Sequence, residues 1–350
     1  MNNTYYLSAN TSNGYISFFD SSIESFKKII ILKNASKQAR EKLFLDLIPI
    51  LDYKNICYDK IIRSGTADET DAVIINQLST VIADEGLFSK EFPLYADVIN
   101  FAEHLRYDFE VQNEIANVKN KIEILNKRMY RHLNQAKIIH DEWEKIYISN
   151  MDFDKLDSSC RDLIDNMFAG ITKKENTYQN SDRFLGSLLP RGSINYIEDL
   201  TNNLNKRIYI KGRPGTGKST LLKKIVSKAK EYNLNTETYY CSFDSKSLDM
   251  VIIRDLGLAI FDSTSPHEVF PGRSCDEIFD IYEIAVNNDT DLNFSDELLQ
   301  ISGQYNHEIK KAKECLYTCN AYRRRLDSII YDETVVSNCV QRIIALSSLN

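Results

Sequence analysis

The chain has 350 residues and a formal net charge of −7 at pH 7, from 43 Lys and Arg residues against 50 Asp and Glu residues. Hydrophobic residues make up 43% of the chain, while Gly and Pro number only 12 and 6. This composition excludes a wholly disordered chain and a collagen-like chain. The acidic balance argues against a general nucleic-acid-binding protein, and the length is typical of two domains.

Membrane and secretion signals are not expected in this sequence. No run of about 18 apolar residues occurs, which argues against a transmembrane helix. The segment from Met1 to Tyr6 has neither a basic nor an apolar stretch, unlike a secretory signal. The seven cysteines form no CxxC pair, and no close His pair accompanies Cys315 and Cys319. We therefore expect reduced, packed thiols instead of a metal site, and a cytoplasmic protein.

The first expected elements are a strand and a helix separated by a polar segment. The apolar run from Ile29 to Leu32 predicts a buried strand. Leu43, Leu47 and Ile48 then follow at helical spacing. The segment between these elements, residues 33–42, reads KNASKQAREK and contains no glycine.

A long helix is expected next, within an arm at about residues 103–148. Apolar residues recur there at alternating steps of three and four, a heptad pattern. Nine of the ten positions are apolar, and the tenth is His132: Ile115, Val118, Ile122, Leu125, Met129, His132, Ala136, Ile139, Trp143 and Ile146. The helix would extend about 48 Å at 1.5 Å per residue. It could pack against its own domain or form a coiled coil with a partner. A polar connector, residues 172–182, follows.

The strongest motif of the sequence lies between residues 206 and 229. A predicted strand, Lys206 to Lys211, precedes a predicted helix that contains Leu221, Leu222, Ile225, Val226 and Ala229. Between them, Gly212-Arg213-Pro214-Gly215-Thr216-Gly217-Lys218-Ser219-Thr220 matches the phosphate-binding pattern G-x-x-x-x-G-K-[ST]. Its glycines let consecutive N–H groups face phosphate oxygens at a helix N-terminus. Lys218 would neutralise the β- and γ-phosphates of ATP, and the Ser219 hydroxyl would bind Mg²⁺.

A phosphate-binding loop also needs a carboxylate for its metal ion, and two aspartates follow predicted strands nearby. The run Leu258 to Phe261 ends at Asp262, which we expect to hold Mg²⁺ through a water molecule. The run Tyr239 to Phe243 ends at Asp244, which could orient a nucleophile or substrate. Either aspartate could instead cap the next helix. His267 could face the γ-phosphate or be an ordinary loop residue.

The second half of the chain repeats the first at an offset of 178 positions. Between positions 64 and 84, eight residues are identical to their equivalents between 242 and 262, where composition alone predicts about one or two. These residues are Ser64, Asp71, Val73, Ile74, Ile75, Leu78, Ile82 and Asp84. The pattern indicates a tandem duplication.

The first copy lacks the residues of the phosphate-binding loop. At the aligned positions the three glycines, the lysine and the serine are replaced, in order, by Asn34, Lys37, Ala39, Arg40 and Glu41. A sharp loop is harder to form without glycine, and the carboxylate of Glu41 would repel phosphate. We therefore expect the first copy to keep the fold and to bind no nucleotide.

Three segments resemble a family of duplicated bacterial P-loop proteins that are described as ATPases or as nucleotide-binding, kinase-like proteins. The segments are residues 6–20 (YLSANTSNGYISFFD), 210–220 (IKGRPGTGKST) and 256–267 (LGLAIFDSTSPH). The resemblance covers nearly the whole chain and implies ATP binding without naming a phosphoryl acceptor. The family pattern has an intact loop in both copies. This chain departs from it at residues 34–42, which argues against a two-site mechanism.

A weaker helical pattern, Ile309, Ala312, Leu316 and Cys319, marks a second arm. Arg323, Arg324 and Arg325 on it are either solvated or close enough to reach a phosphate.

An ABC-type ATPase is a competing interpretation of the second copy. Residues 301–304 (ISGQ) resemble the signature of that class, and residues 329–333 (IIYDE) resemble its carboxylate strand. A similar stretch, residues 138–142, lies in the long heptad helix, which favours a helix at both places.

Together these patterns predict an α/β protein with two tandem P-loop NTPase-like domains, each with a mostly parallel sheet covered by helices and a helical arm. We expect a degenerate domain over residues 1–171, a linker over 172–182 and an intact domain over 183–350. The expected activity is Mg²⁺-dependent ATP hydrolysis in the second copy, with Lys218, Asp262 and Asp244 as catalytic residues. A small-molecule or nucleotide kinase and a non-catalytic ATP-dependent switch stay open. The expected partners are the nucleotide and a protein or second chain bound through the arms, without membrane or nucleic acid.

Overall fold

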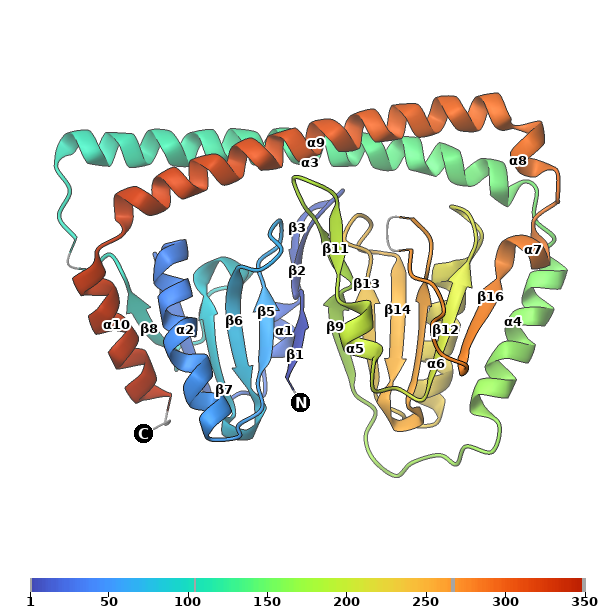
Figure 1. Ribbon diagram of the computed structural model, residues 1–350, viewed down its shortest axis with the longest axis horizontal. Coiled ribbons are helices and arrows are strands. Elements are labelled where there is room, and N and C mark those ends of the chain that lie inside the picture. Colours follow the sequence, from blue (N-terminus) through green and yellow to red (C-terminus); the bar gives the residue numbers. More distant parts are fainter. Residues whose placement is uncertain (1, 104, 266–267, 348–350) are drawn as a thin grey trace.

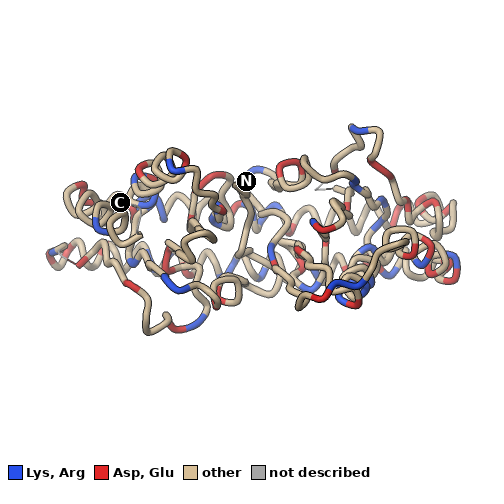
Figure 2. Tube along the Cα trace, turned by 90° about the horizontal axis from the view of Figure 1, so that it is seen from below, with Lys and Arg blue, Asp and Glu red and all other residues tan. Residues whose placement is uncertain are grey.

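The computed structural model of the protein describes residues 2–103, 105–265 and 268–347. Two α/β units lie side by side beneath two long helices (Figure 1). Positive and negative residues are interspersed along the whole trace (Figure 2). Among the described helices, none combines the length and the apolar character needed to cross a membrane. All seven cysteines are free thiols.

The first unit is built on a six-stranded sheet in the order β1-β5-β6-β7-β4-β8. Its strands are β1 (Asn3–Tyr5), β4 (Lys28–Lys33), β5 (Asp59–Ile62), β6 (Thr70–Ile75), β7 (Thr80–Asp84) and β8 (Asp97–Asn100). The unit also contains the hairpin β2 (Ser8–Thr11) and β3 (Gly14–Ser17), helices α1 (Phe19–Ser22) and α2 (Lys37–Tyr53), and the 3₁₀ turns η1 (Asn76–Leu78) and η2 (Glu85–Leu87).

The second unit repeats this topology in the order β9-β13-β14-β15-β12-β16. Its strands are β9 (Asn180–Phe184), β12 (Lys206–Lys211), β13 (Thr236–Tyr240), β14 (Leu248–Ile253), β15 (Leu258–Asp262) and β16 (Asp276–Asp280). It also contains the hairpin β10 (Gly186–Leu188) and β11 (Ser193–Asn195), the turn η3 (Arg254–Leu256), and helices α5 (Ile197–Thr201), α6 (Lys218–Glu231), α7 (Ile281–Ala285) and α8 (Thr290–Asn293). Strands β12, β14 and β15 lie 178 positions after β4, β6 and β7 at both ends, as the repeat predicts.

Both sheets are mixed, although most of their strand pairs are parallel. Strand β14 is antiparallel to both neighbours, as is β6 in the first sheet. The reason lies in the connection between β13 and β14, residues 241–247, which is too short for the helical crossover that joins parallel strands.

The buried residues alternate along the central strands and form separate cores on the two faces of each sheet. Ile30 and Leu32 of β4 face α2, while Ile29 and Ile31 enter a core shared by the two units. In the second unit, Ile208 and Ile210 of β12 face α6. Tyr209 between them joins the shared core. The two copies are therefore packed into one body.

Two long antiparallel helices, α3 (Phe109–Ile148) and α9 (Ser295–Ile330), span both units (Figure 1). They pack against each other through a cluster that contains Met129, Leu133, Ala312 and Leu316. Helix α3 has 40 residues, which corresponds to about 60 Å at 1.5 Å per residue. This length carries the chain from one unit to the other. The two arms expected from the sequence thus pair with each other within one chain.

The helices that follow this pair are exchanged between the units. Helix α4 (Phe153–Phe168) contributes to the core of the second unit, where Leu156 and Ile164 pack. Helix α10 (Glu333–Leu346) packs on the first unit through Val340 and Ile343. The expected domains, residues 1–171 and 183–350, divide the chain by sequence copy. In the structure, each copy contributes one helix to the unit of the other copy.

The segments that resemble an ABC-type ATPase are not arranged as that interpretation requires. Residues 301–304 lie inside α9, and residues 329–333 extend from the end of α9 to the start of α10 without a strand. Asp332 caps α10 by accepting a hydrogen bond from the N–H of Val335 at 2.9 Å. Residues 138–142 lie inside α3, as expected.

Candidate functional site

The loop between β12 and α6 carries the phosphate-binding motif. Helix α6 begins at Lys218 with Gly217 as its N-cap. Gly215 and Gly217 have φ angles of 76° and 90°, values that favour glycine because it lacks a Cβ. A Cβ on Gly215 would also lie 2.8 Å from the backbone oxygen of Glu144 in α3. The glycines therefore allow both the turn of the loop and the close approach of α3.

The side chain of Lys218 lies between this loop and the end of β15. Its Nζ donates a hydrogen bond to the backbone oxygen of Arg213 at 2.9 Å and lies 3.6 Å from Oδ2 of Asp262. The Thr216 hydroxyl donates to the same Arg213 oxygen at 2.8 Å. Ser219 Oγ accepts the N–H of Leu248 at 2.9 Å. The motif thus holds Lys218 close to the carboxylate that the sequence predicts.

Two carboxylates are neighbours at this edge of the second sheet. Asp262 ends β15. The antiparallel register, which pairs Met250 with Phe261, places Asp249 beside Asp262. Oδ1 of Asp262 accepts hydrogen bonds from both the N–H and the hydroxyl of Thr264.

Asp249 is a site residue that the sequence reasoning missed. It is buried, and its pKa is raised to about 8, first by burial and then by the charge of Asp262. Lys218 only partly offsets these effects. The available signal was the repeat itself, because the equivalent position in the first copy, Asp71, is also an aspartate.

Helix α3 covers the loop with residues from the first copy. Lys137 Nζ lies 3.4 Å from Oδ2 of Asp244. Burial, together with the charges of Lys137 and Lys218, lowers the pKa of His140 to about 4, so its ring is neutral at pH 7. The His140 ring packs 5.9 Å from Phe243 and 5.9 Å from Tyr305 of α9. The loop therefore lies beneath both long helices.

The remaining predicted residues occupy the edges of this site. Arg213 pairs with Asp291 at 2.6 Å, and its guanidinium lies 5.1 Å from the Tyr282 ring centroid. Pro214 lies in the loop and Thr220 in the first turn of α6. Strand β13 ends at Tyr240, so Asp244 lies in the following turn, where Oδ1 accepts the N–H of Lys246 at 3.0 Å. His267 lies outside the described residues.

Two groups of side chains near the loop could hold a metal ion. Asp249 and Asp262, with the Ser219 hydroxyl nearby, offer the oxygen ligands that Mg²⁺ prefers. His140, Asp141 and Glu144 on α3 have ligand atoms within 4.8 Å of one another, but Lys137 already pairs with Asp141. The aspartate pair therefore fits magnesium better.

The equivalent loop in the first copy is replaced by helix. Helix α2 begins at Lys37, which is equivalent to Gly215, whereas α6 begins three residues later in the alignment. Ser36 caps α2, because its Oγ accepts the N–H of Ala39 at 3.2 Å. The amides that would surround a phosphate thus belong to a capped first turn.

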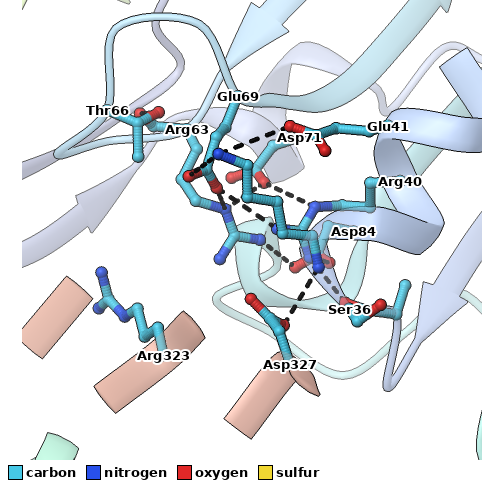
Figure 3. A network of polar contacts seen from close by, with 12 residues as sticks. Ser36, Arg40, Glu41, Arg63, Thr66, Glu69, Asp71, Asp84, Arg323 and Asp327 are labelled. Carbon is cyan, nitrogen blue, oxygen red and sulfur yellow. Dashed lines mark hydrogen bonds and ion pairs between the residues drawn. The ribbon is translucent and has the colours of Figure 1, made fainter. Parts of the chain in front are cut away.

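The first copy has an equivalent aspartate pair, Asp71 and Asp84, and two arginines contact it (Figure 3). Nη1 of Arg40 lies 3.0 Å from Oδ2 of Asp84. Arg63 lies 2.6 Å from Oδ1 of Asp71 through Nε and 3.1 Å from Oδ1 of Asp84 through Nη2. Each of these aspartates therefore contacts a guanidinium group.

The second copy has one cation fewer at the aligned positions. Arg40 is equivalent to Lys218, but Arg63 is equivalent to Cys241, a neutral residue whose pKa is raised above its usual value by burial. Burial is the largest cause of the raised pKa of Asp249, followed by the charge of Asp262. Burial raises the pKa of Asp71 as well, although Arg63 and Arg40 act against this shift in the first copy.

Comparison of this chain with protein-family models, with curated protein sequences and with solved structures found no match in any of the three. The function proposed below therefore rests on the sequence motif and on the geometry of the site.

Proposed function

We propose that the second copy binds Mg²⁺–ATP and that the protein is an ATPase with one working site. The proposal is carried by the position of Lys218, which lies between a glycine loop at the start of α6 and the carboxylate of Asp262, 3.6 Å away. Loop amides, a lysine and a carboxylate are the groups that a triphosphate and its metal ion require together. We also propose that the protein is related to the duplicated P-loop proteins and that it is cytoplasmic.

Each residue has a defined role in this proposal. The backbone N–H groups of residues 215–219 would donate hydrogen bonds to the phosphate oxygens, and Lys218 would neutralise the transferred phosphoryl group. Ser219, Asp262 and Asp249 would hold the magnesium ion, which supplies further positive charge against the phosphates. Helix α3 would exclude water from one side of the site, which strengthens these interactions.

The comparison between the copies supports a divalent cation in this place. The first copy neutralises Asp71 and Asp84 with Arg40 and Arg63. The second copy keeps both aspartates and has Lys218 alone. A bound cation would restore the balance that Arg63 provides in the first copy.

A second candidate function is an ATP-dependent switch, favoured by the contact between Gly215 and helix α3. A Cβ on Gly215 would lie 2.8 Å from the Glu144 backbone oxygen, so the loop and α3 are closely packed. Phosphates that rearrange the loop would act directly on α3. Helix α3 pairs with α9, so such a change would reach the first unit.

Calorimetric titration with a non-hydrolysable ATP analogue and Mg²⁺ tests the site. We expect one nucleotide per chain, and at least about 100-fold weaker binding for Lys218→Ala, since a phosphate charge loses its counter-charge. Lys224→Ala is the matched control, because Lys224 lies on the same helix and makes an exposed pair with Asp157. Two nucleotides per chain, or normal affinity in Lys218→Ala, would contradict the proposal.

Turnover separates the candidate reactions. Phosphate release from ATP in water alone indicates an ATPase. Turnover that rises with one added metabolite, with transfer of the phosphoryl group to it, indicates a kinase. One-to-one ATP binding without turnover indicates the switch, and it would then be accompanied by an ATP-dependent change in shape.

A further inference from the structure

A cavity of about 580 Å³ lies in the first unit, where the phosphate-binding loop is lost. Its floor is formed at the carboxyl ends of β4 and β7, by residues that include Asn34, Ala35 and Asp84. Its roof is formed by α3 and α9, so both sequence copies contribute to it. The carboxyl edge of an open α/β sheet is the usual place for a ligand, and this volume is typical of small-molecule sites.

Within the described residues, cationic side chains already contact the carboxylates on the floor of the cavity. Arg40 and Arg63 neutralise the aspartates there. Lys37 lies 3.1 Å from Glu69. Figure 3 shows Arg40 and Arg63 directed toward Asp84. A ligand of this cavity would therefore bind without a metal ion.

The helices above the floor supply the unpaired positive charge. Lys119 of α3 and Arg324 of α9 line the cavity and form no ion pair within the described residues. Arg323 donates a hydrogen bond to Asn320 on its own helix at 3.1 Å. In Figure 3 it lies beside the network, and no dashed line joins it to the network. In total six cationic and four anionic side chains line the cavity, which favours an anionic ligand over a cation.

Two of the anionic residues that line the cavity, Asp327 and Glu85, accept hydrogen bonds from backbone N–H groups. Oδ1 of Asp327 accepts the N–H of Lys37 at 3.1 Å, and Oε1 of Glu85 accepts the N–H of Asn34 at 2.7 Å. These contacts leave Arg323 and Arg324 free to face a ligand.

The cavity also has an apolar wall and one unsatisfied polar atom. Ile115 and Ile122 of α3 and Ile330 of α9 are among its lining residues. Tyr107 is a further lining residue, and its hydroxyl is buried and has no hydrogen-bond partner among the described residues. A buried polar group of this kind is stabilised when a ligand supplies its partner.

We propose that this cavity binds a small organic phosphate of about nucleotide size, without a metal ion. Arg323, Arg324 and Lys119 would hold the phosphate, while the isoleucines and Tyr107 would contact the organic part. The site is separate from the glycine loop, so it does not depend on ATP binding in the second copy.

The test uses the full chain with Lys218→Ala, which removes the phosphate site of the glycine loop. AMP is titrated by calorimetry in the presence of EDTA, and inorganic phosphate is titrated in parallel. We expect one AMP per chain and weaker binding of phosphate, because phosphate alone leaves the apolar wall and the Tyr107 hydroxyl uncovered. Arg323→Gln with Arg324→Gln should weaken AMP binding about tenfold or more, since each removes a charge-assisted hydrogen bond.

Arg325→Gln is the matched control. Arg325 is the next residue on α9, but it pairs with Glu114 at 2.6 Å and is not among the lining residues. It should leave AMP binding unchanged, and thermal unfolding will check that each variant is folded. No binding of AMP at millimolar concentration, equal affinity for AMP and phosphate, or no effect of the double substitution would each overturn the proposal.

Discussion

At the scale of single residues, the two copies differ in the cationic side chains that lie beside an equivalent pair of aspartates. Asp71 and Asp84 contact two guanidinium groups. Among the described residues, Lys218 is the one cationic side chain close to Asp262, and its charge also acts on Asp249. Burial and the neighbouring charge of Asp262 disfavour the charged form of Asp249, so Asp249 holds its proton at pH 7. That difference supports the proposed binding of a cation in the second copy.

The raised pKa of Asp249 predicts proton release when Mg²⁺ and nucleotide bind. Below a pKa of about 8 the free protein holds this proton, and metal binding requires the charged carboxylate. Release should approach one proton at about pH 7 and vanish by about pH 9, where Asp249 is already ionised. Calorimetry in buffers of different ionisation enthalpy measures it. Asp249→Asn should release none, and an unchanged release in that variant would rule out Asp249 as the source.

An added cationic side chain in the second copy should block the proposed Mg²⁺ site. Cys241→Arg restores the residue that the first copy has at the aligned position, Arg63. We expect it to lower the pKa of Asp249 and to weaken Mg²⁺-dependent ATP binding by at least about tenfold, because the guanidinium competes with the ion for the same carboxylates. Cys241→Ser is the control, since it adds no charge and should bind normally. Full Mg²⁺-dependent binding by a folded Cys241→Arg protein would contradict this account.

At the scale of elements, one strand–turn–helix segment has two forms in this chain. After β4 the helix begins at once, with Ser36 as its cap. After β12 the chain makes a loop through Gly215 and Gly217 before α6 begins. The residues at these positions decide the form, because left-handed backbone angles are costly for residues with a Cβ.

Gly217→Ala should therefore destabilise the loop. A φ of 90° costs alanine about 1–2 kcal/mol in the free energy of unfolding, and the new Cβ would lie 3.3 Å from Leu156 of α4. Nucleotide affinity should fall with it. Gly303→Ala in α9 is the control, since a Cβ there meets nothing within 4 Å and helix propensity should stabilise the protein by up to about 1 kcal/mol. Denaturant unfolding measures the free energy of unfolding of both variants. An equal change in the two variants would contradict this prediction.

At the scale of the whole molecule, the exchange of α4 and α10 joins the two copies more firmly than the connector does. Each of these helices is buried in the core of the other copy's unit. Helices α3 and α9 also pack together along the roof (Figure 1). The duplication has thus produced one interlocked body.

A cut in the connector should leave the protein intact. Asn176 and Thr177 are exposed, so a protease site placed between them is accessible. After cleavage we expect both fragments to elute together in gel filtration and to separate only in denaturant, because the exchanged helices hold them. Fragments that separate under native conditions would show that the exchange does not occur in solution.

The elements and the motif could be predicted because their signals are local. Apolar residues at a period of two or of 3.6 mark strands and helices, so β12, α6 and the position of Asp262 at the end of β15 follow from short stretches of sequence. The mixed direction of the sheets was not predicted, although the short connection between β13 and β14 was its visible signal.

By itself, the sequence of this protein determined the duplication, the glycine loop and its loss in the first copy, since each is written in residue identity and spacing. Only the tertiary structure decided which surfaces meet: α3 with α9, α4 with the second sheet, and Asp249 with Asp262. Helical periodicity shows that a face is apolar but does not specify its partner, because burial is non-directional. The roof over the loop and the cavity of the first copy both follow from those long-range contacts.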